Sequence, residues 1–177
     1  MIDLKSIQKI IMNKFSYTNI HQIPKIEKIV INTNLGLDCQ NKQIFKQTVE
    51  EIRTISGQHP ITTKAKKSIS DFKLKENMPV GLKVTLRRKK MYAFFEKLVK
   101  LVLPRIRDFR GSDLNGFDQY GNFNLGIEDK SIFPELELNG NDKKRGYNIT
   151  IVTTASTKDE AAFLLRTMGF IFKQDTL

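Results

Sequence analysis

The sequence predicts an α+β fold, in which one domain over residues 1–177 holds a mostly antiparallel sheet with helices on one face. Short segments rich in β-branched residues alternate irregularly with segments of helical periodicity, which argues against a parallel sheet. A length of 177 residues suits one domain, and a hydrophobic content of 40% is sufficient for a core. The other face of the sheet is expected to be free, and such a face is a common platform for RNA.

The chain is expected to begin with a helix followed by a strand. Apolar residues follow helical spacing over residues 4–15, and Asp3 can cap this helix. Pro24 then interrupts the chain, and residues 26–32 are rich in β-branched residues, which favours a strand. A turn is expected over residues 35–38.

A second helix and a long hairpin are predicted next. Apolar residues at helical spacing predict a helix over residues 44–55, and Gly57 stands where a C-terminal cap is expected. Residues 69–72 and 80–87 are expected to form two strands. The long polar segment 73–79 between them predicts an exposed, protruding hairpin tip.

The C-terminal half predicts two more helices and two more strands. Residues 91–103 form an amphipathic pattern that ends before a proline, and the Gly- and Asn-rich segment 111–122 predicts a loop. Alternating apolar residues predict strands over residues 123–127 and 149–153. Thr157 and Glu160 fit a capping box for the last helix.

The positive charge of the chain is concentrated in residues 62–110. This block holds fifteen Lys or Arg and four Asp or Glu, a net charge of +11, which equals the formal net charge of the whole chain. A focused positive field is suited to a polyanion, because each neutralised phosphate releases condensed counterions. The alternative is a solvated basic face without a partner. The basic residues form three clusters: Lys64, Lys66 and Lys67; residues 87–90; and Arg105, Arg107 and Arg110 beside Phe109.

One strand carries the clearest local pattern of the basic block. Alternation places Val84 and Leu86 on the core face, and Lys83, Thr85 and Arg87 on the other face. Two cations and a hydroxyl suit phosphate and ribose oxygens. The alternative is an ordinary amphipathic strand that faces water.

Motifs of catalysis, metal binding and membrane insertion are missing from the sequence. It has no apolar run of membrane-spanning length and no leader pattern, and its single cysteine, Cys39, forms no intramolecular disulfide. His21 and His59 lack metal-ligand spacing. The pairs Glu50–Glu51 and Glu128–Asp129 are interpreted as surface charge. We therefore expect no enzymatic activity, no cofactor, no metal and no membrane partner.

Seven ordered motifs resemble bacterial-type large-subunit ribosomal protein five, the family that binds 5S rRNA, over nearly the whole chain. They occupy residues 55–60, 63–68, 78–87, 104–111, 117–122, 132–135 and 145–146. The resemblance implies a structural, RNA-binding protein in the central protuberance of the large subunit, whose concave sheet face holds 5S rRNA. The abundance of Ile, Lys and Asn fits an AT-rich genome, so we expect an organellar (mitochondrial or plastid) or a bacterial ribosome.

The resemblance also implies which residues meet which partner. It places Asn32, Gln58 and Thr85 at 5S rRNA. The charge pattern and the strand alternation add Lys64, Lys66, Lys67, Lys83 and Arg87 to the residues expected there. Residues of the loop expected to reach the elbow of P-site tRNA are Lys73, Lys75, Asn77, Met78 and Pro79. Further contacts with large-subunit rRNA or a bridge are assigned to Arg105, Arg107, Arg110, Phe117 and Tyr120. Loops around 111–121 and 132–135 are expected to bridge to small-subunit protein thirteen, beside other central-protuberance proteins.

The sequence departs from the family pattern at two places. Asn34 replaces a glycine after the first strand, and Asn tolerates left-handed backbone better than most residues. The acidic segment 135–142 also differs from the family pattern, and the sequence indicates no function for it. Two other classes of function stay open at this point: a free-standing RNA-binding module or chaperone, and a small enzyme acting on nucleic acid. Stoichiometric co-purification with large subunits separates the first of these from a ribosomal protein.

Overall fold

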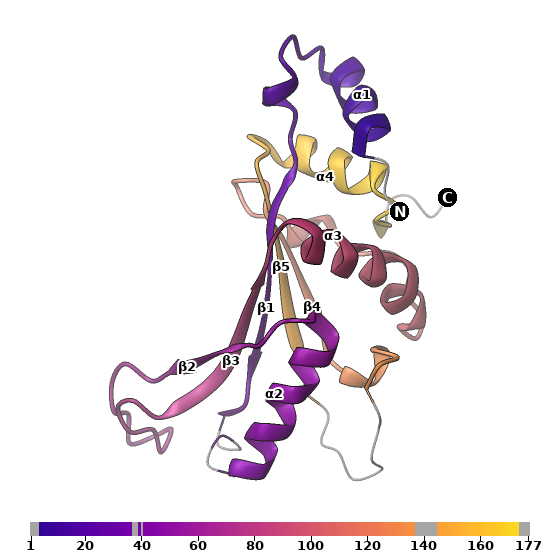
Figure 1. Ribbon diagram of the computed structural model, residues 1–177. Coiled ribbons are helices and arrows are strands. Elements are labelled where there is room, and N and C mark those ends of the chain that lie inside the picture. Colours follow the sequence, from indigo (N-terminus) through magenta and orange to yellow (C-terminus); the bar gives the residue numbers. More distant parts are fainter. Residues whose placement is uncertain (1–3, 37–38, 40, 137–144, 174–177) are drawn as a thin grey trace. The chain divides into compact units, whose positions relative to one another are not determined.

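The computed structural model describes residues 4–36, 39, 41–136 and 145–173, and it has an α+β fold (Figure 1). The α-helices are α1 (Leu4–Phe15), α2 (Lys42–Ser56), α3 (Arg88–Lys97) and α4 (Lys158–Thr167). The strands are β1 (Ile26–Asn34), β2 (Ile61–Lys64), β3 (Pro79–Leu86), β4 (Phe123–Ile127) and β5 (Tyr147–Thr153). They form one antiparallel sheet in the order β2-β3-β1-β5-β4. The predicted fold class is therefore confirmed.

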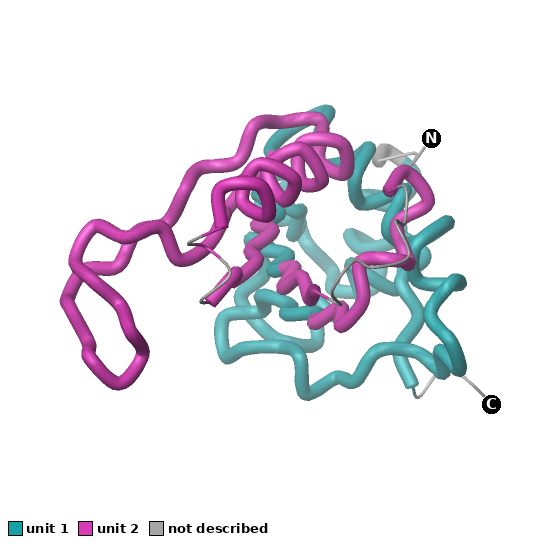
Figure 2. Tube along the Cα trace, turned by 90° about the horizontal axis from the view of Figure 1, so that it is seen from below, with its two compact units in different colours: residues 1–29, 87–125, 150–177 teal, residues 30–86, 126–149 magenta. Residues whose placement is uncertain are grey.

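The chain groups into two compact units, each made of segments that are far apart in the sequence (Figure 2). Unit 1 comprises Met1–Ile29, Arg87–Leu125 and Thr150–Leu177, and unit 2 comprises Val30–Leu86 and Gly126–Ile149. A single domain over residues 1–177 stays a prediction. Asp3, the expected cap of α1, Asp38 of the expected turn and most of the acidic segment lie outside the described residues.

In unit 2, α2 packs against β3. Ile52 and Ile55 of α2 are buried, because helical spacing brings them to the same side. The helix begins at Asn41, whose Oδ1 accepts a hydrogen bond from the backbone N–H of Gln43 at 3.0 Å. It ends at Gly57, which has φ 65° and donates its N–H to the carbonyl of Arg53 at 2.8 Å. The predicted glycine cap is confirmed.

The hairpin uses a different first strand from the one predicted. Strand β2 is Ile61–Lys64, and it pairs antiparallel with β3 through Ile61 opposite Lys83 and Thr63 opposite Gly81. The prediction of a strand over residues 69–72 was wrong. Ile61, Thr62 and Thr63 are all β-branched, whereas Ile69 and Phe72 lie beyond the paired strands and are 42% and 64% exposed.

The hairpin tip comprises residues 65–78 and has hydrogen-bonded structure of its own. The N–H of Ala65 donates to the carbonyl of Met78 at 2.8 Å, which closes the base of the tip. Further out, Ile69 and Leu74 exchange two backbone hydrogen bonds of 3.0 and 3.1 Å, and the turn between them contains Lys73 at φ 52°. The tip is thus a nested hairpin, in contrast to the simple loop 73–79 predicted from the sequence.

In unit 1, the core contains a cluster of aromatic rings. Phe123 packs on Phe117, Phe170 and Phe172 with ring centroids 4.8 to 5.5 Å apart. Phe95 of α3 joins this cluster through Phe170 at 6.4 Å. Rings at these distances gain attraction beyond the area that they bury.

In unit 1, α4 begins at the predicted Thr157 cap. α3 begins at Arg88, before the expected residue 91, and ends at Lys97, before the expected residue 103. The hydroxyl of Thr157 caps α4 by accepting from the N–H of Glu160 at 3.3 Å, and the Glu160 carboxylate accepts from the N–H of Ser156 at 2.9 Å. α3 passes into a π-helical turn at Leu98–Val102 and a 3-10 turn at Leu103–Arg105, which includes Pro104. No helix in the described part of the chain is long and apolar enough to cross a membrane.

Candidate nucleic-acid interface

The face of β3 opposite α2 presents polar side chains. Leu82, Val84 and Leu86 are at most 1% exposed, whereas Lys83 is exposed and Thr85 is half-buried. Side chains therefore alternate between the two faces of β3, as the sequence predicted. A hydroxyl and an ammonium group lie on the side of the strand away from the core.

Strand β1 continues the same polar face within unit 2. Asn32 and Asn34 are exposed, while Ile31 and Thr33 between them are 2% and 1% exposed. The N–H of Leu35 donates to the carbonyl of Val80 at 3.0 Å, which fixes the register of β1 against β3. Counting back along the two antiparallel strands places Asn32 beside Lys83. The structure thus brings together three predicted residues: Asn32, Lys83 and Thr85.

Gln58, in the segment between α2 and β2, bonds to the backbone of β3 beside this face. Its Nε2 donates a hydrogen bond to the backbone carbonyl of Thr85 at 3.2 Å. The hydroxyl of Ser56 accepts from the backbone N–H of Gln58 at 3.2 Å and fixes the backbone there. Gln58 and Thr85 are 27 residues apart in the sequence and adjacent in the structure.

Two residues of the same face were not singled out by the sequence reasoning. Thr63 on β2 lies opposite Gly81 and is half-buried, and Asn148 on β5 is exposed. The alternation of buried Ile149 and Ile151 would have placed Asn148 on the polar face. Thr63 could not be found in this way, because its strand was assigned to the wrong residues. We name the set Asn32, Asn34, Thr63, Lys83, Thr85 and Asn148 the polar face of unit 2.

Asn34 ends β1 with its side chain. Its Oδ1 accepts from the N–H of Gly36 at 3.0 Å, and Gly36, with φ 53°, takes the left-handed conformation. Asn34 itself stays extended as part of β1. The asparagine that replaces the family glycine therefore stabilises the turn through its side chain, as Asx turns do, and not through a left-handed backbone.

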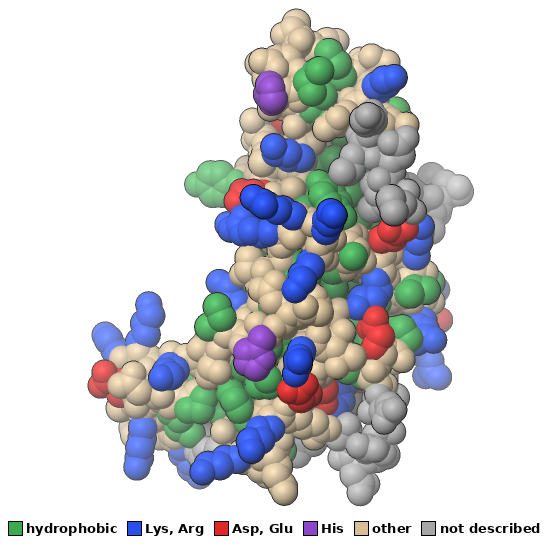
Figure 3. All heavy atoms as spheres, viewed as in Figure 1, with side chains coloured by type: hydrophobic (Ala, Val, Ile, Leu, Met, Phe, Trp, Pro, Cys, Tyr) green, Lys and Arg blue, Asp and Glu red, His purple; other side chains and the backbone are tan. Residues whose placement is uncertain are grey.

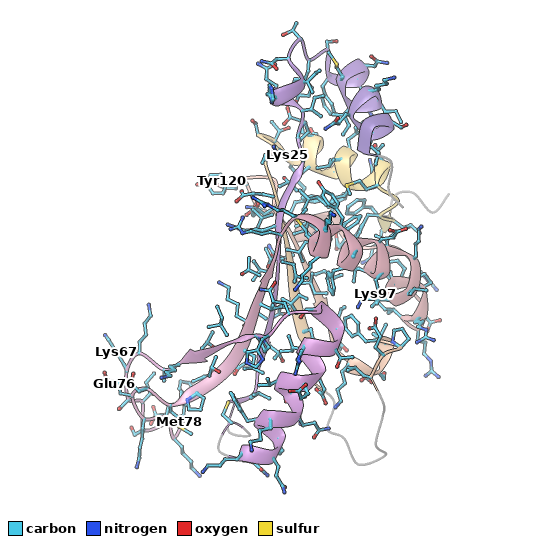
Figure 4. The ribbon with its side chains drawn as sticks, viewed as in Figure 1. Lys25, Lys67, Glu76, Met78, Lys97 and Tyr120 are labelled. Carbon is cyan, nitrogen blue, oxygen red and sulfur yellow. The ribbon has the colours of Figure 1, made fainter. Side chains whose placement is uncertain are left out.

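Lysines surround the hairpin that extends from the polar face of unit 2 (Figure 3). The exposed ones are Lys64, Lys66, Lys67, Lys73 and Lys75. Lys67 and Glu76 lie at the tip (Figure 4), and Asn77 is exposed with φ 64°. Met78 and Pro79 are half-buried: Met78 closes the base of the tip, and Pro79 begins β3.

The remaining predicted residues lie in unit 1. Arg105, Arg107 and Arg110 are exposed. The guanidinium of Arg87 lies 3.4 Å from the Glu27 carboxylate, with side chains 55% and 46% exposed. An exposed pair of this kind contributes roughly 0–1 kcal/mol to stability, so it leaves Arg87 able to meet another anion.

The loop 117–122 contains two aromatic residues that were predicted to contact a partner, and they differ in exposure. Tyr120 is 75% exposed, and Asp118 holds the loop by accepting from the N–H groups of Tyr120 at 3.0 Å and Asn122 at 2.7 Å. The ring of Phe117 is only 8% exposed and packs on Phe123 and Phe172. Apolar burial takes the Phe117 ring into the core, and its assignment to rRNA or a bridge stays a prediction.

Unit 2 also contains a buried ionic cluster that was not predicted from the sequence. The Lys130 Nζ lies 2.6 Å from the Glu51 carboxylate, with side chains only 3% and 10% exposed. Arg145 Nη1 lies 3.8 Å from the same carboxylate and donates to the Thr48 hydroxyl, and the Tyr147 hydroxyl donates to Glu51 at 3.3 Å. Burial, followed by the Glu51 charge and this hydrogen bond, raises the pKa of Tyr147. The interpretation of Glu51 as surface charge was wrong.

No three His, Cys, Asp or Glu side chains of the described residues are grouped so that they could hold a metal ion. The Cys39 thiol is buried and donates to the carbonyl of Val80 at 2.9 Å. The arrangement of the polar face offers hydrogen-bond donors, acceptors and positive charge, which are the groups that bind RNA backbones.

Comparison with known proteins identifies the family. Residues 19–75 match the family model described as "Ribosomal protein L5", and residues 79–172 match the model that describes the C-terminus of the same ribosomal family. The chain is 53% identical over 165 residues to "Large ribosomal subunit protein uL5c" of Heterosigma akashiwo, covering 93% of this chain and 91% of that protein.

Bacterial relatives are equally similar. "Large ribosomal subunit protein uL5" of Desulfotalea psychrophila is 54% identical over 162 residues, which is 92% of this chain and 90% of that protein. The protein of the same name from Macrococcus caseolyticus is 49% identical over 171 residues, 97% of this chain and 96% of the relative. These relatives are plastid and bacterial, which is consistent with the expected organellar or bacterial origin. They favour a ribosomal protein over the free-standing module and the nucleic-acid enzyme. The chain belongs to the ribosomal protein L5 (uL5) family and is a structural, non-enzymatic constituent of the large ribosomal subunit.

Proposed function

We propose that the polar face of unit 2 binds 5S rRNA. The observation that carries this proposal is the alternation along β3 and β1. Leu82, Val84, Ile31 and Thr33 are buried, whereas Asn32, Lys83 and Thr85 lie on the opposite face, which also carries the apolar Val30 and Ile61. Neutral amides and hydroxyls, with few charges among them, suit the ribose, base edges and phosphates of an irregular RNA loop. Gln58 supports the same surface through its bond to β3.

The hairpin tip is proposed to contact the elbow of P-site tRNA on the assembled ribosome. Its lysines are exposed, and its two tiers of backbone hydrogen bonds present them from a defined support. Preorganised contacts lose less conformational entropy when a partner binds. This contact lies beyond large-subunit membership and rests on the family resemblance together with the position of these lysines.

Contacts with large-subunit rRNA and with small-subunit protein thirteen are proposed for other segments. Exposed Arg105, Arg107, Arg110 and Tyr120 are the residues that can meet rRNA or a bridge partner in unit 1. The loops 111–121 and 132–135 are the proposed bridging segments. Phe117 was assigned to the same contacts, but its ring is only 8% exposed and offers little surface to a partner.

Substitution of Thr85 tests the 5S rRNA proposal. Thr85→Val keeps the branched shape but removes the hydroxyl, so it is expected to weaken 5S rRNA binding by about 1 kcal/mol, the cost of a lost buried hydrogen bond. Val84→Ala, on the core face, is expected to lower the free energy of unfolding by about 2 kcal/mol instead. Filter binding with 5S rRNA and thermal unfolding of the full chain measure the two effects.

Thr54→Val is the matched control for the hydroxyl. Thr54 is exposed on α2 in the same unit, and its hydroxyl donates to the Glu50 carbonyl at 2.9 Å. Its loss should leave 5S rRNA affinity unchanged. If Thr85→Val lowers stability and spares RNA binding, the proposed assignment of the two faces is inverted.

A further inference from the structure

An apolar hollow lies between the hairpin tip and the end of β1, within unit 2. Its volume is about 390 Å³, and Phe72, Leu74 and Val80 supply its apolar lining. Asn34, Asp71 and Lys73 are the polar residues among its described lining. We name this feature the Phe72 hollow. It has the size and the mixture of apolar walls with a few polar groups that small planar ligands require.

The aromatic ring of Phe72 is exposed to solvent. Its side chain is 64% exposed, and it occupies the four-residue turn that the Ile69–Leu74 pair closes. The N–H of Lys73 donates to the carbonyl of Ser70 at 2.9 Å, so the backbone on both sides of the ring is fixed. One exposed aromatic ring is common on a protein surface, but this ring also borders the hollow, so ring and hollow form one continuous apolar surface. The ring is therefore a candidate contact surface held by a defined turn.

The charge around the hollow favours RNA as the partner. Residues 61–78 contain five lysines against Asp71 and Glu76, a net charge of +3. Apolar side chains lie between the lysines of this hairpin (Figure 3). Aromatic rings among cations are the usual means by which proteins bind unstacked bases, because every base has a π-face and every nucleotide a phosphate.

We propose that the Phe72 hollow receives one unstacked nucleobase of the RNA that the hairpin tip meets, with the base stacked on the Phe72 ring. This inference rests on the proposed RNA contact of the tip. Leu74 and Val80 form the apolar floor below the base, and Lys73 meets the adjoining phosphate. Asn34 uses Oδ1 for the N–H of Gly36, and its Nδ2 group, which donates to no described residue, is available to a base edge.

The proposal is tested by measuring the affinity of the wild type and of Phe72 variants for two RNA strands, one with bases and one without. The probes are a twelve-nucleotide oligoadenylate and an RNA backbone of equal length without bases, titrated into the full chain at low salt and followed by fluorescence anisotropy. Phe72→Ala is expected to weaken binding of oligoadenylate about tenfold, since stacking contributes strongly per base, and to change binding of the abasic strand less than about twofold. Phe72→Tyr keeps the ring and is expected to retain wild-type affinity.

Ile20→Ala is the matched control, because Ile20 is 63% exposed in unit 1, outside the basic block. It should leave both affinities unchanged. Equal losses on both strands, or no binding of oligoadenylate by the wild-type chain, would overturn the hollow as a base site. If Phe72→Ala instead lowers only the amount of protein retained in large subunits, the occupant is an apolar protein side chain and the proposal fails. The rate of P-site tRNA release from reconstituted ribosomes in which residues 70–73 are replaced by Asn-Gly tells failure of the base site apart from failure of the proposed RNA contact of the tip, because only the latter leaves the release rate unchanged.

Discussion

At the scale of single residues, the buried ionic cluster is expected to be sensitive to substitution. Glu51 on α2 accepts contacts from Lys130 and from Arg145 and Tyr147, which lie on either side of residues 131–144. One carboxylate thus ties both ends of that segment to the same helix. Removing one partner of a buried pair leaves an uncompensated charge and is strongly destabilising.

Tyr147→Phe gives a pH-dependent test of this cluster. Its loss of the hydrogen bond to Glu51 is expected to lower the free energy of unfolding by about 2 kcal/mol near pH 8. The folded-state pKa of Tyr147 is raised above the ordinary value for tyrosine of about 10. Its contribution is therefore complete below pH 10 and is lost as pH rises further, because the unfolded chain releases the proton first. The difference between wild type and variant should shrink as the pH rises above about 10.

Denaturant unfolding at several pH values measures that difference. Burial and the neighbouring Glu160 raise the pKa of Tyr17 to about 12, but Tyr17 is present in both proteins and its effect cancels. Tyr120→Phe serves as the control, since Tyr120 is 75% exposed, and it should have little effect at pH 8. If Tyr147→Phe lowers the free energy of unfolding by the same amount at every pH, burial does not raise the pKa of the Tyr147 hydroxyl.

At the scale of elements, the hairpin is two nested units with separate roles. The base is held by the pairing of β2 with β3. The outer unit is held by the Ile69–Leu74 pair, by the bond from Lys73 N–H to the Ser70 carbonyl and by the bond from Glu76 N–H to the Ser68 hydroxyl. The outer unit lies beyond the last paired residues of β2 and β3, so it can be altered without changing the strands of the polar face. A deletion of residues 74–78 would be a poor test, because it would also remove Met78, which closes the base.

Replacing residues 70–73 by Asn-Gly tests the role of the outer unit. Ile69 and Leu74 exchange both backbone hydrogen bonds, which is the flanking pair that a two-residue type I′ turn requires. The fold and 5S rRNA affinity should be retained, while P-site tRNA should dissociate faster from reconstituted ribosomes that carry the variant. The rate of tRNA release, with incorporation of the protein confirmed, is the measurement. Unchanged release would mean that the outer unit does not contact tRNA.

At the scale of the whole molecule, charge is distributed unevenly along the chain. All of the net charge of +11 can be assigned to residues 62–110, and six of the fifteen cations there fall in the part that belongs to unit 2. The nine others belong to unit 1. Both units therefore offer cations to an RNA partner, whereas the rest of the chain is neutral.

Binding to 5S rRNA should weaken steeply with salt for this reason. A plot of log K against log salt is expected to have a slope of several units, with each phosphate contact contributing about 0.7 to 0.9. Lys83→Gln should reduce the slope by about 1. Lys9→Gln, an exposed change outside the basic block, is the control and should leave it unaltered. A slope near zero for the wild type would refute an electrostatic basis for binding.

Local patterns in the sequence predicted most of the elements and one full strand of the interface. The alternation at residues 83–87 placed Val84 in the core and Thr85 opposite to it, and the caps at Gly57 and Thr157 were found from residue type alone. These features depend on neighbours within a few residues. The positions of Asn32 and Gln58 beside β3 agree with the family resemblance, although neither could be derived from spacing.

The sequence by itself determined the α+β class, most helices and strands, the concentration of charge and the ribosomal family. Periodicity, capping and net charge are properties of short segments, so they can be read without contacts. Only the tertiary structure decided that β3 pairs with residues 61–64, that Glu51 and Phe117 are buried, and that Phe72 borders a hollow with Asn34. Each of these outcomes depends on which distant residues meet, since burial and pairing energies exceed the weak local preferences of a single segment.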